Sequence, residues 1–316
     1  MKPFLIFGGK LFLFMSMKIL VTGSNGLLGQ KLSDLLLKNP NYNLIASSKG
    51  PNRYPQSKGM IYESIDVSSY NELSSVIVQY KPDAVIHTAA MTNVDQCEEA
   101  REECRKLNVL AVEHLAKLAE IHNFYLVHLS TDFVFDGENG PYREDDTPNP
   151  LSFYGQSKLD AETTLLSSAI NYSILRTIIV YGVAADMSRS NIVLWAKGAL
   201  EKGNPIKVVN DQYRMPTLAE DLAQACILAI EKRAQGIYHI SGKDYMSVIE
   251  MVRRIATFFK LDDSIIEETD SSTLNQAAKR PPRTGFVLDK AIHELGYKPH
   301  SFEEGLAIVQ KQLESK

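Results

Sequence analysis

Two side chains near the middle of the sequence have the types and spacing needed to move a proton. Tyr154 and Lys158 lie four apart in Tyr-Gly-Gln-Ser-Lys, so on a helix that begins near Tyr154 they share a face. A phenol, with an ordinary pKa near about 10, is a weak acid at neutral pH, but a neighbouring ammonium stabilises the phenolate. Thr131, at the end of a predicted strand, could hydrogen-bond the same substrate oxygen. Together they predict a general acid site for a carbonyl.

A glycine-rich segment could bind the cofactor that such a reaction needs. Glycines 23, 26 and 29 follow an apolar strand and open a helix in Thr-Gly-Ser-Asn-Gly-Leu-Leu-Gly. This spacing allows a tight turn, the approach of a pyrophosphate to the backbone, and close packing of helix and strand. The helix N-terminus adds free N–H groups for the anion. We predict dinucleotide contacts at Gly23, Asn25, Gly26, Leu27, Leu28 and Gly29.

The end of the second strand bears on the choice between NADP and NAD. A carboxylate there binds the ribose 2′-hydroxyl of NAD, whereas basic residues accommodate the 2′-phosphate of NADP. The segment Ser47-Ser48-Lys49 contains no acid, and Arg53 follows. This favours NADP(H) with contacts from Ser48, Lys49 and Arg53, while NAD(H) stays open and the two cations are alternatively solvated loop charges. Asp66, followed by Val67, either meets the adenine or caps the next helix.

The elements that position these residues alternate between strand and helix from Met17 onwards. We predict strands at 18–22, 43–47, 59–66, 84–88, 124–130 and 172–181, and helices at 27–37, 70–80, 101–122 and from 154. Such alternation is typical of a parallel sheet covered on both faces. It predicts an α/β, doubly wound parallel sheet that binds its ligands at the carboxyl ends of the strands.

The alternation changes after Gly182. Further helices are expected at 191–203, 220–232, 247–259 and 301–313, with short strands at 206–209 and 236–241. Ser247 with Glu250 and Ser301 with Glu304 have the spacing of a capping box. We predict a dinucleotide-binding domain at 17–182, to which 215–242 returns, and a smaller, discontinuous α/β substrate lobe formed by 183–214 and 243–316.

Composition narrows the class of protein. Apolar residues make up 44% and charged residues 23% of the 316 residues, and the net charge is −4. Without a basic tract or an apolar run of about 20 residues, the chain is expected to bind neither nucleic acid nor membrane. Residues 1–16 form an apolar extension of doubtful status, interrupted by Gly8-Gly9-Lys10; a secretory signal is the less favoured alternative.

Cysteine and histidine give no framework for a disulfide or a metal. Cys97, Cys104 and Cys226 lack CxxC spacing, so buried thiols are favoured over a redox or metal pair, in keeping with a reducing, cytoplasmic location. No metal is expected, because the histidines show no ligand spacing and are interpreted as structural or surface residues. They are His87, His114, His122, His128, His239, His293 and His300.

Taken together, the motifs resemble the extended short-chain dehydrogenase/reductase family, and within it the dTDP-4-dehydrorhamnose reductase branch. The resemblance runs from Met17 to the C-terminus. It rests on 23–29, His-Thr-Ala-Ala at 87–90, Val-Asp at 94–95, Ser-Thr-Asp-Phe-Val-Phe-Asp-Gly at 130–137, 154–158, 176–177 with 180–182, 211–212 with 216–217, and 280–281 with 288–290.

The resemblance implies roles beyond those that spacing predicts. It implies a Rossmann domain, a catalytic set of Thr131, Tyr154 and Lys158, and a nicotinamide ribose held by Lys158. It also implies reduction of the C4 keto group of a nucleotide-activated deoxysugar, such as dTDP-4-dehydro-L-rhamnose. Further cofactor contacts are implied at Ala89, Ala90 and Thr92, and contacts to the sugar or its nucleotide at Val94, Asp132, Phe133 and Arg280.

Two departures fall where the substrate would rest. Ile178-Ile179 stands where these reductases usually carry Trp, and Arg214-Met215 where they usually carry glycine and a small residue, so the identity of the sugar stays open. We therefore count Ile179 and Arg214 among the candidate substrate residues.

Two rival functions also stay open: a nucleotide-sugar epimerase or dehydratase with bound NAD, and a non-catalytic subunit like the beta subunit of methionine adenosyltransferase. The oligomeric state also stays open, with a homodimer as one alternative.

Overall fold

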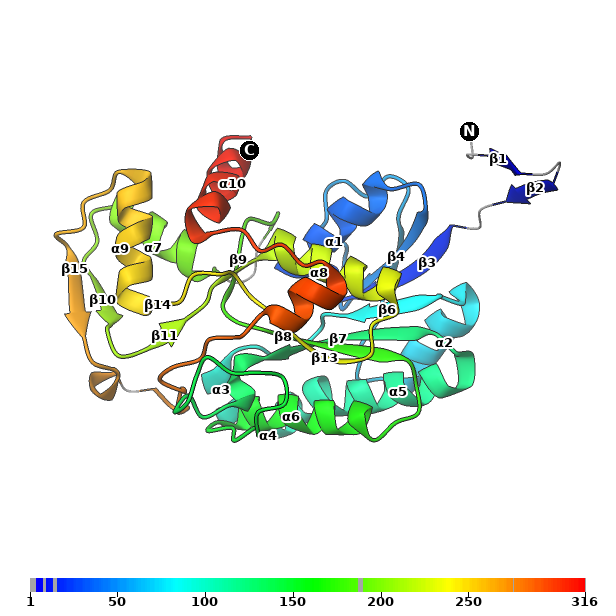
Figure 1. Ribbon diagram of the computed structural model, residues 1–316, viewed down its shortest axis with the longest axis horizontal. Coiled ribbons are helices and arrows are strands. Elements are labelled where there is room, and N and C mark those ends of the chain that lie inside the picture. Colours follow the sequence, from blue (N-terminus) through cyan, green and yellow to red (C-terminus); the bar gives the residue numbers. More distant parts are fainter. Residues whose placement is uncertain (1–3, 8–9, 14–15, 187–189, 275, 316) are drawn as a thin grey trace.

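The computed structural model describes residues 4–7, 10–13, 16–186, 190–274 and 276–315. Its centre is a seven-stranded sheet in the order β13-β8-β7-β6-β3-β4-β5, and all neighbouring strands are parallel (Figure 1). The strands are β3 (Met17–Thr22), β4 (Tyr42–Ser48), β5 (Ile61–Ser64), β6 (Ala84–His87), β7 (Tyr125–Thr131), β8 (Tyr172–Thr177) and β13 (Gly236–Ile240). The predicted doubly wound α/β fold is confirmed.

Alternating side chains of these strands are buried in two apolar cores, one on each face of the sheet. Ile19, Val21 and Val127 point to one face of the sheet, where they pack with α1 (Leu27–Lys38) and α8 (Ala219–Lys232). Leu20 and Leu126 point to the other face. That face is covered by α2 (Tyr70–Tyr80), α5 (Ala111–His122) and α6 (Phe153–Leu166). Burial on both faces explains why the central strands are continuous apolar runs.

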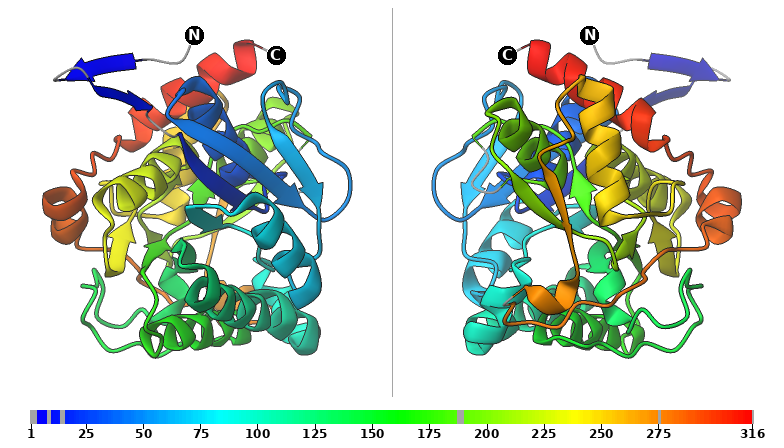
Figure 2. Two further views of the ribbon diagram at one scale, coloured as in Figure 1. Left: turned by 90° about the vertical axis from the view of Figure 1, so that its right-hand side faces the viewer. Right: turned by 90° about the vertical axis from the view of Figure 1, so that its left-hand side faces the viewer.

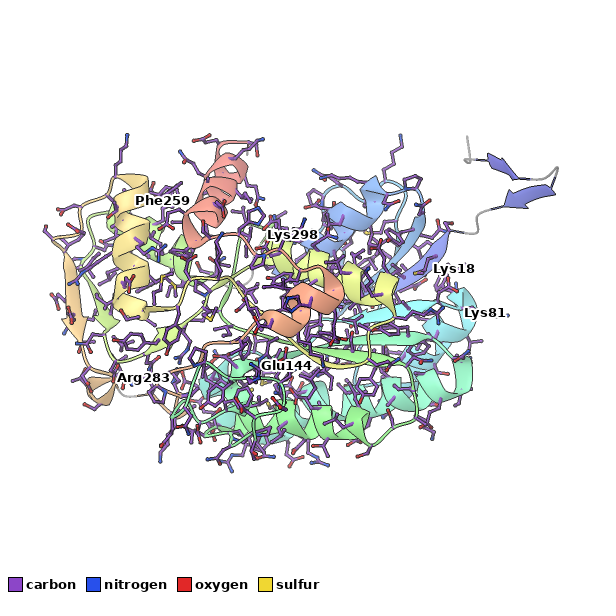
Figure 3. The ribbon with its side chains drawn as sticks, in the orientation of Figure 1. Lys18, Lys81, Glu144, Phe259, Arg283 and Lys298 are labelled. Atoms are coloured by element: carbon purple, nitrogen blue, oxygen red, sulfur yellow. The ribbon has the colours of Figure 1, made fainter. Side chains whose placement is uncertain are left out.

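A second body with its own core lies beside the sheet, at the left of Figure 1 and facing the viewer in the right-hand view of Figure 2. Its elements are β10 (Ile206–Val209) paired with β15 (Ile266–Thr269), β11 (Tyr213–Arg214) paired with β14 (Met246–Ser247), α7 (Ile192–Glu201), α9 (Val248–Phe259) and α10 (Phe302–Glu314). Figure 3 places Phe259 of this body and Lys81, after α2, at opposite ends of the molecule. Between the two bodies, β9 (Val180–Tyr181) pairs with β12 (Thr217–Leu218).

One segment assigned to the smaller lobe packs elsewhere. The π-helix η4 (Ala291–Leu295) and Tyr297 join the core that α1 and α8 form with the sheet. The final helix α10 returns to the second body, where Ser301 and Glu304 form both hydrogen bonds of the predicted capping box.

Two predicted elements are interrupted in the structure. The strand predicted at 172–181 ends at Thr177, because Ile179 takes a φ of +32°, a left-handed value that branched side chains rarely adopt. The helix predicted at 101–122 is divided into α4 (Arg101–Arg105), the π-helix η1 (Lys106–Leu110) and α5. Both predictions of continuity were wrong, and both breaks lie next to the candidate site.

The remaining elements are short. They are β1 (Phe4–Phe7) and β2 (Lys10–Leu13), which pair antiparallel, α3 (Val94–Glu99) and the 3-10 turns η2 (Asp132–Val134) and η3 (Ser271–Thr273). The expectation for residues 1–16 falls partly on 1–3, 8–9 and 14–15, which lie outside the described residues. Among the helices of the described ranges, none has the length and apolar character needed to cross a bilayer.

Candidate active site

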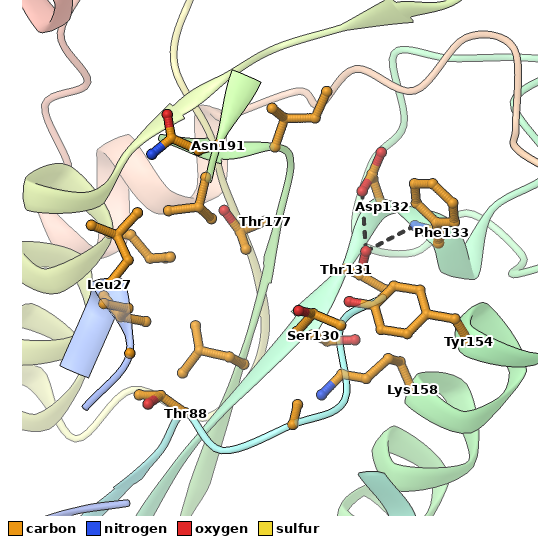
Figure 4. A pocket seen from close by; sticks show the side chains of 18 of the residues that line it. Leu27, Thr88, Ser130, Thr131, Asp132, Phe133, Tyr154, Lys158, Thr177 and Asn191 are labelled. Carbon is orange, nitrogen blue, oxygen red and sulfur yellow. Dashed lines mark hydrogen bonds between the residues drawn. The ribbon is translucent and has the colours of Figure 1, made fainter. Parts of the chain in front are cut away.

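A cavity of about 650 Å³ opens at the carboxyl ends of the central strands, between α1, α6 and the start of α7 (Figure 4). It is lined by Asn25, Gly26, Leu27, Leu28, Gly29, Thr88, Ala90, Thr92, Val94, Leu129, Ser130, Thr131, Asp132, Phe133, Tyr154, Lys158, Thr177, Ile179, Val180, Ser190, Asn191, Ile192 and Leu222. The structure thus brings together most of the residues predicted to contact cofactor or substrate.

The glycine-rich turn forms one wall and fits the diphosphate of a dinucleotide. Gly23 has a φ of +73°, and a Cβ there would lie 2.7 Å from the backbone nitrogen of Ala89. A Cβ on Gly29 would overlap the carbonyl of Gly23. Gly26 is the N-cap of α1 and no side chain of the described residues caps this helix end. The first N–H groups of α1 therefore lie at the cavity and are available to bind an anion.

The predicted adenosine end lies next to this wall. The hydroxyl of Ser48 accepts a hydrogen bond from the backbone N–H of Asn25, at 3.0 Å. Lys49 forms an ion pair with Asp66 at 2.8 Å, and this contact, with Ser68, lowers the pKa of Asp66 to about 2. The alternative role of Asp66 as a helix cap is wrong, since Ser69 caps α2.

Seven further residues predicted to hold the cofactor are not among the residues that line the cavity. Arg53 donates from its backbone N–H to the side chain of Asn25, and its guanidinium reaches the carbonyl of Asp186 at 3.4 Å. The others are Gly23, Ser48, Lys49, Asp66, Val67 and Ala89, none of which is among the lining residues.

The predicted catalytic trio meets on the opposite wall. Tyr154 and Lys158 project from the first turns of α6, whose N-terminus is capped by Ser152 accepting from the N–H of Gly155. Thr131 ends β7 and accepts a hydrogen bond from the N–H of Phe133 at 3.2 Å. A Cβ on Gly155 would overlap the carbonyl of Phe133, so only glycine lets α6 pack this closely against the end of β7. Figure 4 shows the three side chains pointing into one space.

Burial dominates the electrostatics of this wall. Burial raises the pKa of the Tyr154 phenol, and the facing Thr131 hydroxyl opposes that change. Burial lowers the pKa of Lys158 to about 8, against the attraction of Glu162. The ammonium of Lys158 lies 3.4 Å from Nε2 of His128. The expected stabilisation of phenolate by Lys158 therefore remains a prediction, while a direct lysine–histidine contact is what the structure shows.

Of the residues predicted to contact the sugar or its nucleotide, some line the cavity and others do not. Val94, Asp132, Phe133 and Ile179 line the cavity. Arg280 does not; its guanidinium makes a bidentate ion pair with Asp95, at 2.6 and 3.2 Å.

Arg214 is also absent from the lining. Its guanidinium is buried, lies 3.8 Å from the carboxylate of Asp132 and donates to the carbonyls of Tyr213, Pro281 and Pro282. The expectation that it contacts substrate is therefore corrected for this arrangement: its donors are occupied by the protein.

Comparison with known proteins identifies the family of this chain. The family profile described as "RmlD substrate binding domain" matches residues 17–315. The chain belongs to this family. Methionine adenosyltransferase 2 subunit beta of Pongo abelii is 32% identical over 270 residues, covering 84% of this chain and 78% of that protein. The dTDP-4-dehydrorhamnose reductase of Aggregatibacter actinomycetemcomitans is 30% identical over 312 residues, covering 94% of this chain and 99% of that protein.

Solved structures agree with the family assignment. A dTDP-4-dehydrorhamnose reductase from Bacillus anthracis, determined in complex with NADP, superimposes with a TM-score of 0.81 and 26% identity. The alignment covers 94% of this chain and all of that chain. Thus the RmlD family fold is retained over nearly the whole length, from β3 to α10.

Within this RmlD-type site, several contacts have no counterpart in the sequence predictions. The hydroxyl of Ser130 is buried, lines the cavity and has no hydrogen-bond partner among the described residues. Asn191 lines the cavity from the second body, where it caps α7 and donates to the carbonyl of Gly182. A Ser beside a predicted Thr, and an Asn ahead of an apolar helical run, were the available signals.

Asn108 acts behind the cavity. It lies in the π-helix η1, where its side-chain amide accepts from the N–H of Met91 at 2.8 Å and donates to its carbonyl at 3.0 Å. The same amide donates to Ser157 on α6, at 3.0 Å. Asn108 thereby ties the segment after β6 to the helix that carries Tyr154 and Lys158. A buried amide within an otherwise apolar helical stripe was its signal in the sequence.

Proposed function

We propose that this chain transfers hydride from NADPH, or less readily NADH, to the C4 keto group of a nucleotide-activated 4-keto-6-deoxysugar, dTDP-4-dehydro-L-rhamnose. The observation that carries the proposal is the convergence of Thr131, Tyr154 and Lys158 on one wall of a cavity whose other wall is the uncapped end of α1. The names of the reductase relatives supply the substrate class.

The chain's own residues have distinct tasks in this reaction. NADPH, when bound, supplies the hydride. Tyr154 donates the proton that the carbonyl oxygen needs, and its phenolate is then reprotonated from solvent. Thr131 orients that oxygen by a hydrogen bond, and the charge of Lys158 favours the phenolate. The carbonyl thus gains one hydride and one proton, which completes its reduction to an alcohol.

The polar residues at the end of β4 support NADPH as the preferred donor. Lys49 and Arg53 offer cations for a 2′-phosphate, and the strand end has no acid. Asp66 pairs with Lys49 at 2.8 Å, so a 2′-phosphate would compete with this carboxylate for the lysine. Replacing Lys49 and Arg53 together by alanine is expected to raise the KM for NADPH and to leave the KM for NADH nearly unchanged.

The direct test is the oxidation of NADPH in the presence of enzymatically generated dTDP-4-dehydro-L-rhamnose, with NADH in parallel. Rapid, sugar-dependent loss of the reduced cofactor is expected, and Tyr154→Phe is expected to abolish it. Binding of NADPH without turnover of this sugar would reject the substrate assignment while leaving the cofactor assignment in place.

A second function is favoured by one observation, the similarity to methionine adenosyltransferase 2 subunit beta. In that case the chain binds NADP and a larger partner without reducing a sugar. Stable co-purification with a methionine adenosyltransferase, together with no turnover of any keto sugar, would support it. Retention of Tyr154 and Lys158 on the cavity wall favours the enzyme.

We also propose a cytoplasmic location and the division into a dinucleotide domain and a substrate lobe given above. All three cysteines are free and buried, in keeping with a reducing compartment. Limited proteolysis with and without NADPH tests the division: protection is expected first at the loops around the cavity.

A further inference from the structure

The ammonium of Lys158 is held from a second element of the fold. Its Nζ lies 3.4 Å from Nε2 of His128, and only 4% of Lys158 and 1% of His128 is exposed. His128 lies on β7, two residues before Ser130, so both side chains project from the same face of the strand, the face covered by α6. The helix that carries Lys158 is therefore linked through side chains to the strand that ends in Thr131.

The chemistry of the two groups decides the direction of this contact. An ammonium has only donors, so Nε2 of His128 must be the acceptor and the ring must be neutral, with its hydrogen on Nδ1. Nδ1 is buried and has no hydrogen-bond partner among the described residues. The ring of His128 therefore has no hydrogen bond at Nδ1 among the described residues, and its Nε2 accepts from Lys158.

A second histidine fixes the ring. His87 of β6 stacks on His128 with centroids 5.8 Å apart and an angle of 18° between the planes. Nδ1 of His87 lies 2.8 Å from the hydroxyl of Thr22 on β3. Burial keeps both rings neutral: it lowers the pKa of His87 to about 3 and that of His128 well below its ordinary value. His128 is consequently an acceptor and not a second cation.

Among the described residues, the other titratable groups around Lys158 favour its charged form without a hydrogen bond to its ammonium. Glu162, one turn further along α6, is engaged in a buried bidentate pair with Arg176, at 2.9 and 2.7 Å. Cys97 and Cys104 of α3 and α4 are buried thiols, and Tyr154 shares the wall of the cavity. Within the described part of the chain, His128 is the hydrogen-bond acceptor found for Nζ.

We propose that His128 is a positioning residue, which accepts a hydrogen bond from Lys158 and so keeps its ammonium charged and aimed at the cavity before any ligand binds. The inference rests on the proposed function only for its effect on turnover. The contact itself exists in the free protein and is tested there, so the two proposals can fail separately.

The test follows the titration of Lys158 in the full chain labelled with ¹³C at lysine Cε. The resonance of Lys158 is assigned by its absence from Lys158→Met. In His128→Leu, which lacks the acceptor, the apparent pKa of Lys158 is expected to fall by about one pH unit or more. In His128→Gln, whose amide oxygen can accept the same hydrogen bond, the apparent pKa of Lys158 is expected to be close to that of the native chain. His114→Leu, on α5, is the matched control and should leave it unchanged.

Two results would overturn the proposal. An unchanged pKa of Lys158 in His128→Leu means that the contact has no effect on the charge of Lys158. An equal fall in the leucine and glutamine variants means that the ring acts by packing and not by accepting a hydrogen bond. If His128→Leu does not fold, His128→Met replaces it as the apolar variant. In an active enzyme, the alkaline limb of kcat/KM should move to lower pH in the apolar variant and be restored in His128→Gln.

Discussion

The guanidinium of Arg214 lies 3.8 Å from the carboxylate of Asp132, and the two side chains are only 2% and 3% exposed. The pair joins the end of β7 to the second body, and Thr284 donates a further hydrogen bond to Asp132. Asp132 also accepts from the hydroxyl of Thr131, at 3.1 Å. Arg214 therefore supports the residue that we assign to the carbonyl, without reaching the cavity itself.

Arg214→Met is expected to lower the free energy of unfolding by about 3 kcal/mol, because it leaves a buried carboxylate without its cation. Urea unfolding measures this change. Arg283→Met, an exposed neighbour, is the control and should cost little. Equal stability of Arg214→Met and the native chain would show that the pair contributes nothing.

Tyr154→Phe is expected to reduce kcat at least about a hundredfold, since a general acid is removed and no other phenol lines the cavity among the described residues. The affinity for NADPH, measured by fluorescence, should stay nearly native. Tyr172→Phe on β8, outside the cavity lining, is the control. Turnover that survives in Tyr154→Phe would exclude this residue as the proton donor.

Ser130→Ala is expected to stabilise the ligand-free protein by about 1 kcal/mol, because it removes a buried hydroxyl without a partner. The same change should weaken the binding of NADPH or of the sugar, because Ser130 is among the residues that line the cavity. Ser47→Ala provides the matched control, since its hydroxyl is equally unpartnered but does not line the cavity. Ligand affinities that are equal in the two variants would place Ser130 outside the binding site.

Lys158 makes stability depend on pH in a defined direction. Its pKa falls from an ordinary 10.5 to about 8 in the folded protein, so between these values the unfolded chain binds more protons. The free energy of unfolding should therefore rise with pH across this window, by about 3 kcal/mol relative to Lys158→Met. Below pH 8 and above pH 10.5 the difference between the two proteins should be flat. A constant difference from pH 7 to 11 would contradict the buried charge.

Much of the fold and of the candidate site could be predicted, because local patterns encode them. The strand that ends in Thr22, its glycine-rich turn and α1 follow from periodicity and glycine spacing, and the Tyr154–Lys158 pair from helical geometry. These features depend on residues near one another in the chain. The structure confirms their placement on a single cavity.

What could not be predicted depends on contacts between distant segments. The left-handed backbone at Ile179 breaks a strand that its apolar residues favour, and the carbonyl next to it, of Ile178, accepts from the hydroxyl of Thr217. The partner of Lys158 is thirty positions away, on β7. Arg214 was expected to contact substrate, yet its guanidinium donates to the backbone carbonyls of Pro281 and Pro282. Tertiary contacts decide each case.

The pairing of β9 with β12 has a mechanical consequence. The chain leaves the sheet through β9 and returns through β12, and the two strands run side by side in parallel, Val180 beside Thr217 and Tyr181 beside Leu218. Because these two strands are hydrogen-bonded together, the two ends of the segment that carries Asn191 are held side by side, and a change that separates β9 from β12 would also shift Asn191 relative to the glycine-rich wall.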